Sequence, residues 1–235
     1  MTKEEILKEL AGYGNEGTKK IFLKHGAREP FYGVKVQDLK KIQKKVKKQH
    51  QLSLELYATG NSDAMYLAGL IADETEISKS ELNKWVDEAY WYMISEYTVA
   101  WVAAESKYGY ELGLEWIDSN KEGIASAGWA TLANYAAIKP DIELNIEVFN
   151  ELLDRVEKNI RQAQNRVRFT MNGFVIAIGS YIIELTKKAS SVAKNIGKVN
   201  VDMGGTACKV PFATDYIKKV ADRGSLGKKR KDARC

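Results

Sequence analysis

The residues best suited to chemistry lie between positions 90 and 135, where aromatic side chains are dense. Aromatic rings stack on exposed or extruded nucleic-acid bases. They also fill protein cores, which is the commoner role, because each ring buries a large area. The carboxylates of Glu88, Glu96 and Glu105 fall in the same region and could act as a general base, although a solvated surface position is the more common role. The rings are Tyr90, Trp91, Tyr92, Tyr97, Trp101, Trp116, Trp129 and Tyr135.

Charge is segregated along the chain. Residues 1–48 have 13 basic and 6 acidic side chains, residues 49–160 have 7 and 20, and residues 161–235 have 16 and 5. If the two basic ends converge on one face, that face suits a polyanion. The run Lys40–Lys48 has an equally good explanation as a solvated helix face. The run Lys228–Lys231 follows a glycine-rich stretch, which predicts a flexible basic tail over 224–235 that contacts phosphates or only keeps the chain soluble.

Other chemistries leave little trace. The chain has no Gly-rich phosphate loop before a helix, no HExxH and no CxxC. His25 and His50 have no cysteine near them in sequence, so neither a metal nor another cofactor is expected. Cys208 and Cys235 form no disulfide framework, which favours a reducing, cytoplasmic location.

Helix signals dominate the elements that would position these residues. Leu39, Ile42 and Val46 have helical spacing within Val36–Lys48. Ser78 and Glu81 form a predicted capping box at the start of Lys79–Met93, and Pro140 follows the end of Lys121–Ile138. Further helices are predicted over Lys3–Ala11, Thr18–His25, His50–Thr59, Ser62–Asp73, Ser95–Tyr108, Tyr110–Ser119, Ile142–Asn159, Gln164–Lys188 and Phe212–Asp222.

In one segment the hydrophobic pattern changes from helical spacing to alternation. Val199 and Val201 alternate with polar residues, and Gly204-Gly205 supplies a turn. This pattern predicts a β-hairpin over about 196–211. Such a ribbon could enter a DNA groove or a strand junction, or it could only cap the last repeat.

The whole chain predicts an all-α fold. It has 235 residues, 45% of them hydrophobic, and only 3 prolines. Its apolar stretches fall short of a membrane span, and its first residues form no secretion signal, so no membrane contact is expected. Helix pairs recur at roughly 35–45 residues, which predicts a single HEAT-like α-solenoid domain over 1–223, with an irregular bundle as the alternative.

Four segments in order carry a family resemblance. They are Phe31–Leu39, which begins Phe-Tyr-Gly-Val-Lys, then Trp85–Ser106, Glu115–Ser119 and Arg166–Tyr181. Over most of residues 18–190 the chain resembles the HEAT-like repeat DNA alkylation repair superfamily, which includes the AlkD-like alkylpurine glycosylases. The resemblance implies stacked helical repeats whose concave basic surface binds along a duplex backbone.

The chain departs from the active members of that family where they hold their catalytic groups. Where they have a Trp-Trp-Asp-x-Val-Asp segment, this chain has Ser95–Ala100. The alignment sets Ala100 at the carboxylate, and Glu96 or Tyr97 at the tryptophan. A carboxylate stabilises the oxocarbenium charge that develops when an N-glycosidic bond breaks, and alanine cannot do so.

Two more family positions are changed. An arginine of the next repeat falls at Ala125 or Ser126, and a second tryptophan falls at Phe174. With the predicted hairpin, these changes make the chain most similar to the AlkF/AlkG-like branch. The resemblance to that branch implies branched-DNA binding without clear glycosylase function.

Three functions are compatible with the sequence. The first is a monomeric DNA-binding protein that recognises damaged or branched duplex with little or no base excision, and its affinity should fall with salt. The second is an alkylpurine DNA glycosylase with Glu96, Trp91, Trp101 and Phe174 as substitute site residues. The third is a protein-binding scaffold, favoured if the acidic middle lines the concave face. The expected DNA contacts are Lys35, Arg161, Arg166, Arg168, Lys198, Lys209, Lys228, Lys229, Arg230 and Lys231.

Overall fold

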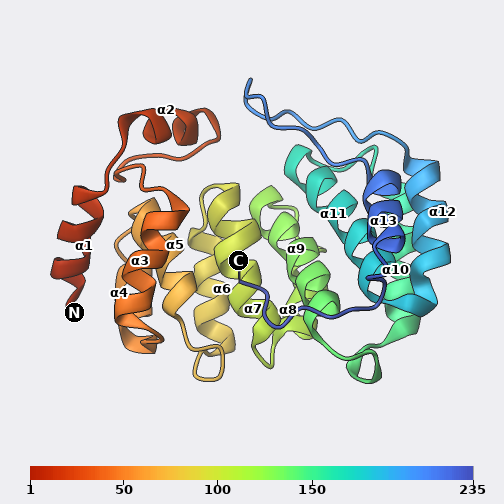
Figure 1. The fold of residues 1–235 in the computed structure, drawn as a ribbon, viewed down its shortest axis with the longest axis horizontal. Coiled ribbons are helices and arrows are strands. Elements are labelled where there is room, and N and C mark those ends of the chain that lie inside the picture. The colour runs from red at the N-terminus through yellow and green to blue at the C-terminus, as the bar shows by residue number, and fades with distance from the viewer. Residues whose placement is uncertain (235) are drawn as a thin grey trace.

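The computed structural model describes residues 1–234, and 66% of the chain is helical. The helices form one curved row that follows the chain, except that α2 lies above the row and α13 packs between α11 and α12 (Figure 1). The first half contains α1 (Lys3–Gly12), α2 (Glu16–Lys24), α3 (Val36–Val46), α4 (His50–Tyr57), α5 (Ser62–Ile71), α6 (Lys79–Glu88), the π-helix η1 (Met93–Val99) and α7 (Ala100–Glu105). The second half contains α8 (Gly109–Trp116), α9 (Glu122–Ile138), η2 (Asp141–Glu143), α10 (Ile146–Asn159), α11 (Asn165–Tyr181), η3 (Ile183–Leu185), α12 (Thr186–Ile196) and α13 (Ala213–Asp222).

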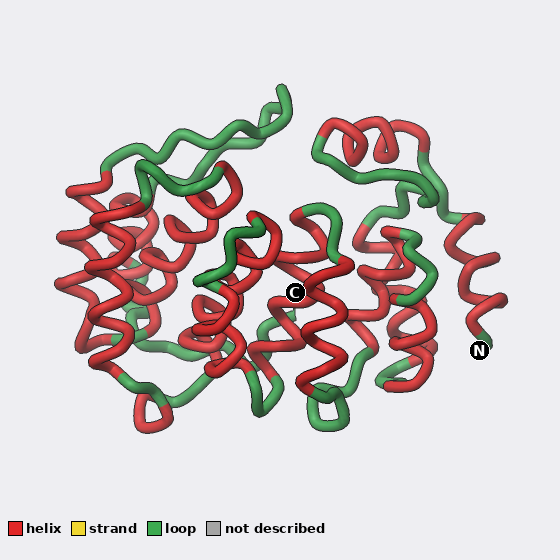
Figure 2. Tube along the Cα trace, turned by 180° about the vertical axis from the view of Figure 1, so that it is seen from behind, coloured by secondary structure: helices red, strands yellow, loops and turns green. Residues whose placement is uncertain are grey.

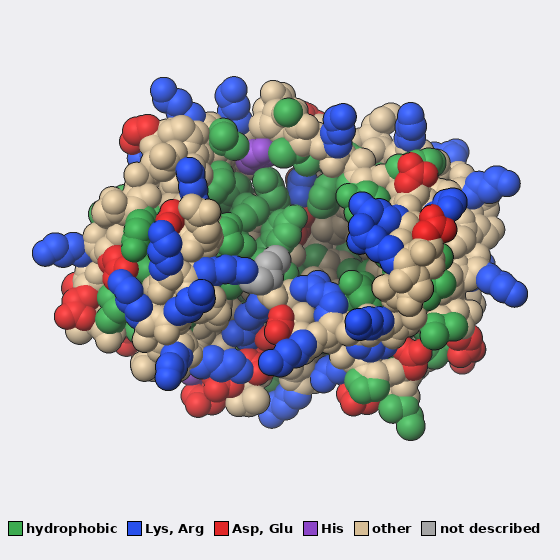
Figure 3. Space-filling model, in the orientation of Figure 1, with side chains coloured by type: hydrophobic (Ala, Val, Ile, Leu, Met, Phe, Trp, Pro, Cys, Tyr) green, Lys and Arg blue, Asp and Glu red, His purple; other side chains and the backbone are tan. Residues whose placement is uncertain are grey.

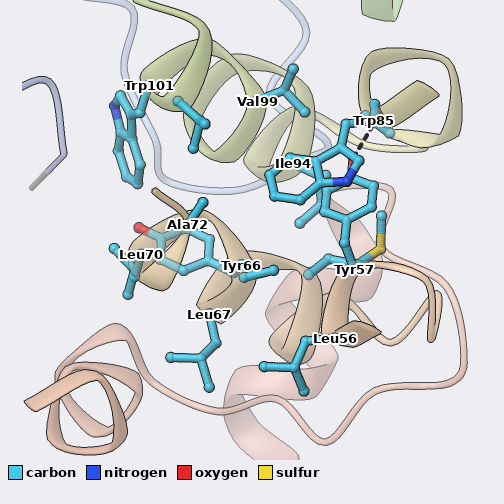
Figure 4. Close-up of a cluster of buried hydrophobic side chains, with 14 of the residues drawn as sticks. Leu56, Tyr57, Tyr66, Leu67, Leu70, Ala72, Trp85, Ile94, Val99 and Trp101 are labelled. Carbon is cyan, nitrogen blue, oxygen red and sulfur yellow. Dashed lines mark hydrogen bonds between the residues drawn. The ribbon is translucent and has the colours of Figure 1, made fainter. Parts of the chain in front are cut away.

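Two hydrophobic clusters form the core. The first extends from α1 to α8 and includes Ala127 of α9, and the second extends from Ile117, just after α8, to α13. Figure 4 shows part of the first cluster, where the rings of Tyr57 and Trp85 stack with centroids 4.1 Å apart. The Tyr57 hydroxyl donates a hydrogen bond to the Trp85 carbonyl at 2.5 Å. Tyr135 of α9 packs against both clusters, so α9 joins the two halves.

The Phe-Tyr-Gly-Val motif has a structural role. The carboxylate of Asp63 at the start of α5 accepts backbone hydrogen bonds from Tyr32, Gly33 and Val34 at 2.6–3.0 Å. Gly33 has φ +76°, and a Cβ there would lie 2.7 Å from the Lys19 nitrogen. The motif therefore anchors the α2–α3 connection to α5.

The predicted hairpin is absent: the described residues contain no strand, and Figure 2 shows only helix and loop. The chain leaves α12, turns at Gly204 and Gly205 and returns to α13 as an extended loop over 197–212. Backbone groups of this loop that would pair with each other in a hairpin are bound by α11 instead. The Asn165 side chain donates to the Asp202 carbonyl (2.9 Å) and accepts from the Asp202 amide (2.7 Å).

The helix predicted over Gln164–Lys188 is broken. It ends at Tyr181, and α12 begins after the short turn η3. The axes on either side of the break differ by 114°. Among the described residues no single helix is long and apolar enough to cross a bilayer, and this bent pair alone passes that test as a combined segment.

The basic tail follows a defined path, in contrast to the flexible segment that the sequence predicts. We call residues 224–234 the strap. The Gly227 and Arg230 amides donate to the carbonyls of Ser180 in α11 and Ala137 in α9 (2.9 and 2.8 Å). Further along, the Arg234 guanidinium donates to the Ala72 carbonyl after α5 at 2.8 Å. The strap therefore crosses the carboxyl-terminal ends of successive helices (Figure 1).

Candidate nucleic-acid interface

Glu96 and Arg166 form a buried ion pair, with side chains that are 3% and 15% exposed. Glu96 lies on the π-helix η1 and is only 4% exposed, which contradicts the solvated position expected for it. Arg166 lies one residue after the start of α11, 70 positions later in the chain. Its Nε donates to Oε1 of Glu96 at 2.8 Å, and its Nη2 donates to Oε2. Both carboxylate oxygens are therefore occupied by one guanidinium, the bidentate geometry that fits arginine to a carboxylate.

Two aromatic rings enclose that guanidinium. The centre of the Arg166 guanidinium lies 4.3 Å from the ring centroid of Tyr92 and 4.3 Å from that of Phe169. Cation–π contacts of this kind are stronger when the cation is partly desolvated. The Arg166 guanidinium is thus bound at its edge by the Glu96 carboxylate and contacted by the rings of Tyr92 and Phe169.

Burial shifts the ionisation of this cluster. Burial raises the pKa of Glu96 to about 7, and the Arg166 guanidinium opposes that rise. Burial also raises the pKa of Tyr92 to about 12. Desolvation and the nearby Arg166 charge lower the pKa of His25, whose ring meets Tyr92 edge-on at 5.5 Å.

Two small cavities flank Glu96. We call the larger one, about 230 Å³, the central hollow. It is lined by Tyr97, Phe169, Gly173, Tyr181 and alanines of α9. The smaller one, about 180 Å³, also borders Glu96, and its other lining residues include Trp91, Tyr92 and Arg166. Figure 3 shows a hollowed, largely hydrophobic centre with Lys and Arg side chains around it.

Three of the four substitute catalytic candidates lie in the core. Trp91 is 6% exposed and donates its indole N–H to Ser62 Oγ (2.9 Å). Trp101 packs edge-on against Tyr66, and Phe174 is fully buried against Trp129 and Phe149. A ring enclosed on all sides cannot stack on an extruded base, so Trp101 and Phe174 are corrected to core residues.

Three of the predicted basic contacts converge on another cavity, which we call the Arg161 recess. This cavity of about 240 Å³ is lined by Arg161, Arg168 and Lys198, together with Ile160, Ile196, Val199 and Asn200. Arg161 and Lys198 are exposed, and Arg161 donates to the Asn195 carbonyl at 3.2 Å. The buried Nε of Arg168 has no hydrogen-bond partner within the described chain. The recess thus gathers cations from α11, the loop before it and the loop after α12.

The remaining predicted contacts are dispersed. Lys35 is exposed at the start of α3, and Lys209 is exposed on the loop 197–212. Lys229 is engaged inside the protein, because its ammonium lies 2.7 Å from Asp141 and donates to the Ala136 carbonyl. Arg230 donates to the Ala233 carbonyl, so Lys229 and Arg230 both form contacts that hold the strap in place. Lys228 and Lys231 are exposed.

Sequence reasoning missed two side chains of the Glu96 cluster. Tyr92 lies within the Tyr90-Trp91-Tyr92 run, but nothing in the run shows which of the three rings meets Arg166. Phe169 follows Arg166 by three residues, the spacing of neighbours on one helix face, which is a usable signal.

The described residues hold no group of three or more His, Cys, Asp or Glu side chains that could bind a metal ion. The Cys208 sulfur and the His25 Nε2 are 3.8 Å apart, where the tip of loop 197–212 meets the end of α2. Gly204 approaches the same helix end so closely that a Cβ would clash with the Lys24 carbonyl oxygen. The contact joins the two ends of the row of helices.

Comparison with known proteins gives a consistent result. Residues 6–193 match the family model described as DNA alkylation repair enzyme. The uncharacterized proteins Lin0241 of Listeria innocua and Lmo0209 of Listeria monocytogenes are 34% and 35% identical over 229 residues, covering 95% of this chain and 99% of each relative. A solved structure aligns over 100% of both chains with a TM-score of 0.91 and 37% identity. It is described as a new family related to the HEAT-like repeat DNA glycosylases with affinity for branched DNA structures.

Proposed function

Because the chain belongs to the DNA alkylation repair enzyme family, we propose that it binds damaged or branched duplex DNA and has little or no glycosylase activity. The affinity for branched DNA described for the solved relative supports this function, since the two chains align along their whole length. The protein is expected to act as a monomer.

The state of Glu96 is the observation that carries the proposal. Excision of an alkylated purine needs a carboxylate that faces the sugar, to stabilise positive charge or orient water. Both oxygens of Glu96 are bound to Arg166, and Ala100, aligned with the family carboxylate, is fully buried. A carboxylate saturated by a guanidinium has little negative potential left for a developing cation.

The Arg161 recess supports the binding half of the proposal. Exposed cations that are not paired with carboxylates release counterions when they meet phosphates, so they contribute salt-dependent affinity. Arg161 and Lys198 meet this condition among the described residues, and Lys209 lies on the same loop as Lys198. We therefore assign the backbone contact to this end of the molecule.

A paired assay tests both halves on one preparation. Release of methylated purines from alkylated duplex is measured beside binding to linear and four-way-junction DNA at two salt concentrations. We expect no release above background, tighter binding to the junction, and affinity that falls as salt rises. The double variant Arg161→Gln/Lys198→Gln should weaken binding about tenfold. The charge-matched control Lys158→Gln/Lys187→Gln, on the exposed faces of α10 and α12, should not. Salt-independent binding would sink the proposal.

A glycosylase is the second candidate, and one observation favours it. Glu96 has a pKa raised to about 7 and borders the aromatic central hollow, the combination expected of an acid–base residue. This function predicts base release that Glu96→Gln abolishes. Absence of both base release and DNA binding would leave a protein-binding scaffold as the remaining function.

A further inference from the structure

A large basic cavity lies outside the Glu96 cluster, and we call it the basin. Its volume is about 830 Å³, and it lies between the end of α3 and the strap. Five lysines line it: Lys44, Lys47, Lys48, Lys139 and Lys231. Figure 3 shows Lys and Arg side chains along the lower edge of the molecular centre, where Figure 1 shows the strap.

Two of the three acidic groups that line the basin, Glu74 and Glu105, are paired, and the third, Asp232, is exposed next to Lys231. Arg234 reaches Glu74 at 2.8 Å and Glu105 at 2.9 Å, and Lys48 also binds Glu74. By contrast, Lys44, Lys47 and Lys231 are exposed and form no ion pair with any residue in 1–234. Three cations therefore remain available on two elements of the lining, two on α3 or just after its end and one on the strap.

Lys47 carries an independent sign of function. Its backbone has φ 60° and ψ −154°, a region that is essentially restricted to glycine. A lysine in this conformation is strained, and such strain is typically kept where the side chain has a task. The Lys47 amide donates to the Gln43 carbonyl at 2.7 Å, which fixes the residue at the rim of the basin.

We propose that the basin is a second DNA-backbone site, which holds the phosphates of a duplex arm other than the arm at the Arg161 recess. This inference rests on the proposed function. Unpaired ammonium groups from two elements that line one cavity suit a polyanionic strand. The basin is lined by residues at or near the ends of α3, α5, α7 and α9 and by the strap, whereas the Arg161 recess is lined by residues between 160 and 200. The two sites share no lining residue, and two distinct sites match a substrate with more than one arm.

The test compares a four-way junction with a linear duplex of equal arm length, using the full chain and titrating at two salt concentrations. In Lys44→Gln/Lys47→Gln/Lys231→Gln, junction affinity should fall about tenfold or more and linear affinity should change little. The slope of log affinity against log salt for the junction should become shallower by up to about 3. The control Lys8→Gln/Lys158→Gln/Lys187→Gln removes the same charge from exposed sites on α1, α10 and α12 and should behave as wild type.

A second variant separates function from structure. Lys47→Gly relieves the backbone strain, so thermal stability should be unchanged or higher while junction affinity falls. Equal losses for junction and linear DNA, or wild-type binding by the triple variant, would overturn the second-arm assignment. Binding of inorganic pyrophosphate that is lost in the triple variant, while that variant binds the junction as wild type does, would assign the basin to a small phosphorylated molecule instead. Failure of the wild type to bind the junction would instead refute the proposed function.

Discussion

Glu96 shows how burial changes what a carboxylate can do. In water a glutamate is an available base, but here the carboxylate is only 4% exposed and both of its oxygens accept hydrogen bonds from one guanidinium. Removing two charges from water is unfavourable, and the mutual attraction of a buried pair often only offsets that penalty. The rings of Tyr92 and Phe169 add favourable contacts to the Arg166 side of the pair. The pair therefore fixes η1 against α11 more than it prepares a reaction.

The raised pKa of Glu96 predicts a pH dependence of stability. With a folded-state pKa of about 7 against an ordinary value of 4.5, the folded protein binds more protons than the unfolded chain between these values. The Glu96 contribution to stability should therefore rise as pH falls from about 8 to about 5, by roughly 1–3 kcal/mol. Urea unfolding of wild type and Glu96→Gln at both pH values measures this contribution. The free energy of unfolding of wild type, relative to that of Glu96→Gln, should be higher at the lower pH. A difference that is constant with pH would contradict the assignment.

The sequence offers Glu96 and Arg166 separately but not as a pair. Both stand out by residue type, yet 70 positions separate them, and no local pattern reports a long-range contact. The π-helical turns of η1 also change which side chains share a face relative to the α-helix predicted over Ser95–Tyr108. For that reason an alignment of this segment with the family shows which residue stands at each position, but not the direction in which its side chain points.

At the scale of elements, local signals were reliable where they arise from local physics. The capping box of Ser78 and Glu81 forms as predicted, because each side chain binds the backbone of the other. The alternating pattern of loop 197–212 gave a wrong prediction because a strand also needs a partner. The backbone groups of Asp202 and the Pro211 carbonyl are instead bound by Asn165 and Asn172 of α11. A side chain that offers both a donor and an acceptor competes with a β-ladder.

Asn165 should therefore hold loop 197–212 in place. In Asn165→Ala both hydrogen bonds to Asp202 are lost, and each contributes about 1 kcal/mol. We expect a decrease of about 1–2 kcal/mol in the unfolding free energy and faster tryptic cleavage after Lys198 and Lys209. Asn200→Ala is the control, since Asn200 is exposed on the same loop. Equal cleavage rates in the two variants would show that other contacts hold the loop.

At the scale of the whole molecule, the strap connects parts that are distant in sequence. Its backbone and basic side chains bind carbonyls at or just beyond the carboxyl-terminal ends of α11, α9 and α5, where cations are favoured by the helix dipole. Sequence reasoning predicted the stacked helices from periodicity but not this path. Gly224 and Gly227 next to a lysine run read as a mobile end, and the groups that fix the strap become neighbours only after the helices stack.

Arg234 is the residue through which the strap should contribute most to stability. Its guanidinium pairs with Glu74 and Glu105, and the three side chains are only 9%, 20% and 11% exposed. Removing one partner of a buried pair leaves the other charges uncompensated, so Arg234→Met should lower the unfolding free energy by about 3 kcal/mol. A change of that size corresponds to a fall of roughly 6–12 °C in Tm for a chain of this length.

The matched control is Lys218→Met, which removes an ion pair with Asp222 whose side chains are 72% and 61% exposed. Solvent screens such a pair, so the loss should stay below about 1 kcal/mol. Calorimetry of the three proteins distinguishes the two cases. If Arg234→Met melts with the control, the strap follows the surface without stabilising it. A large, single-transition shift would instead mean that the last residues of the chain hold the first half of the row to the second, and that basin and fold depend on the same contact.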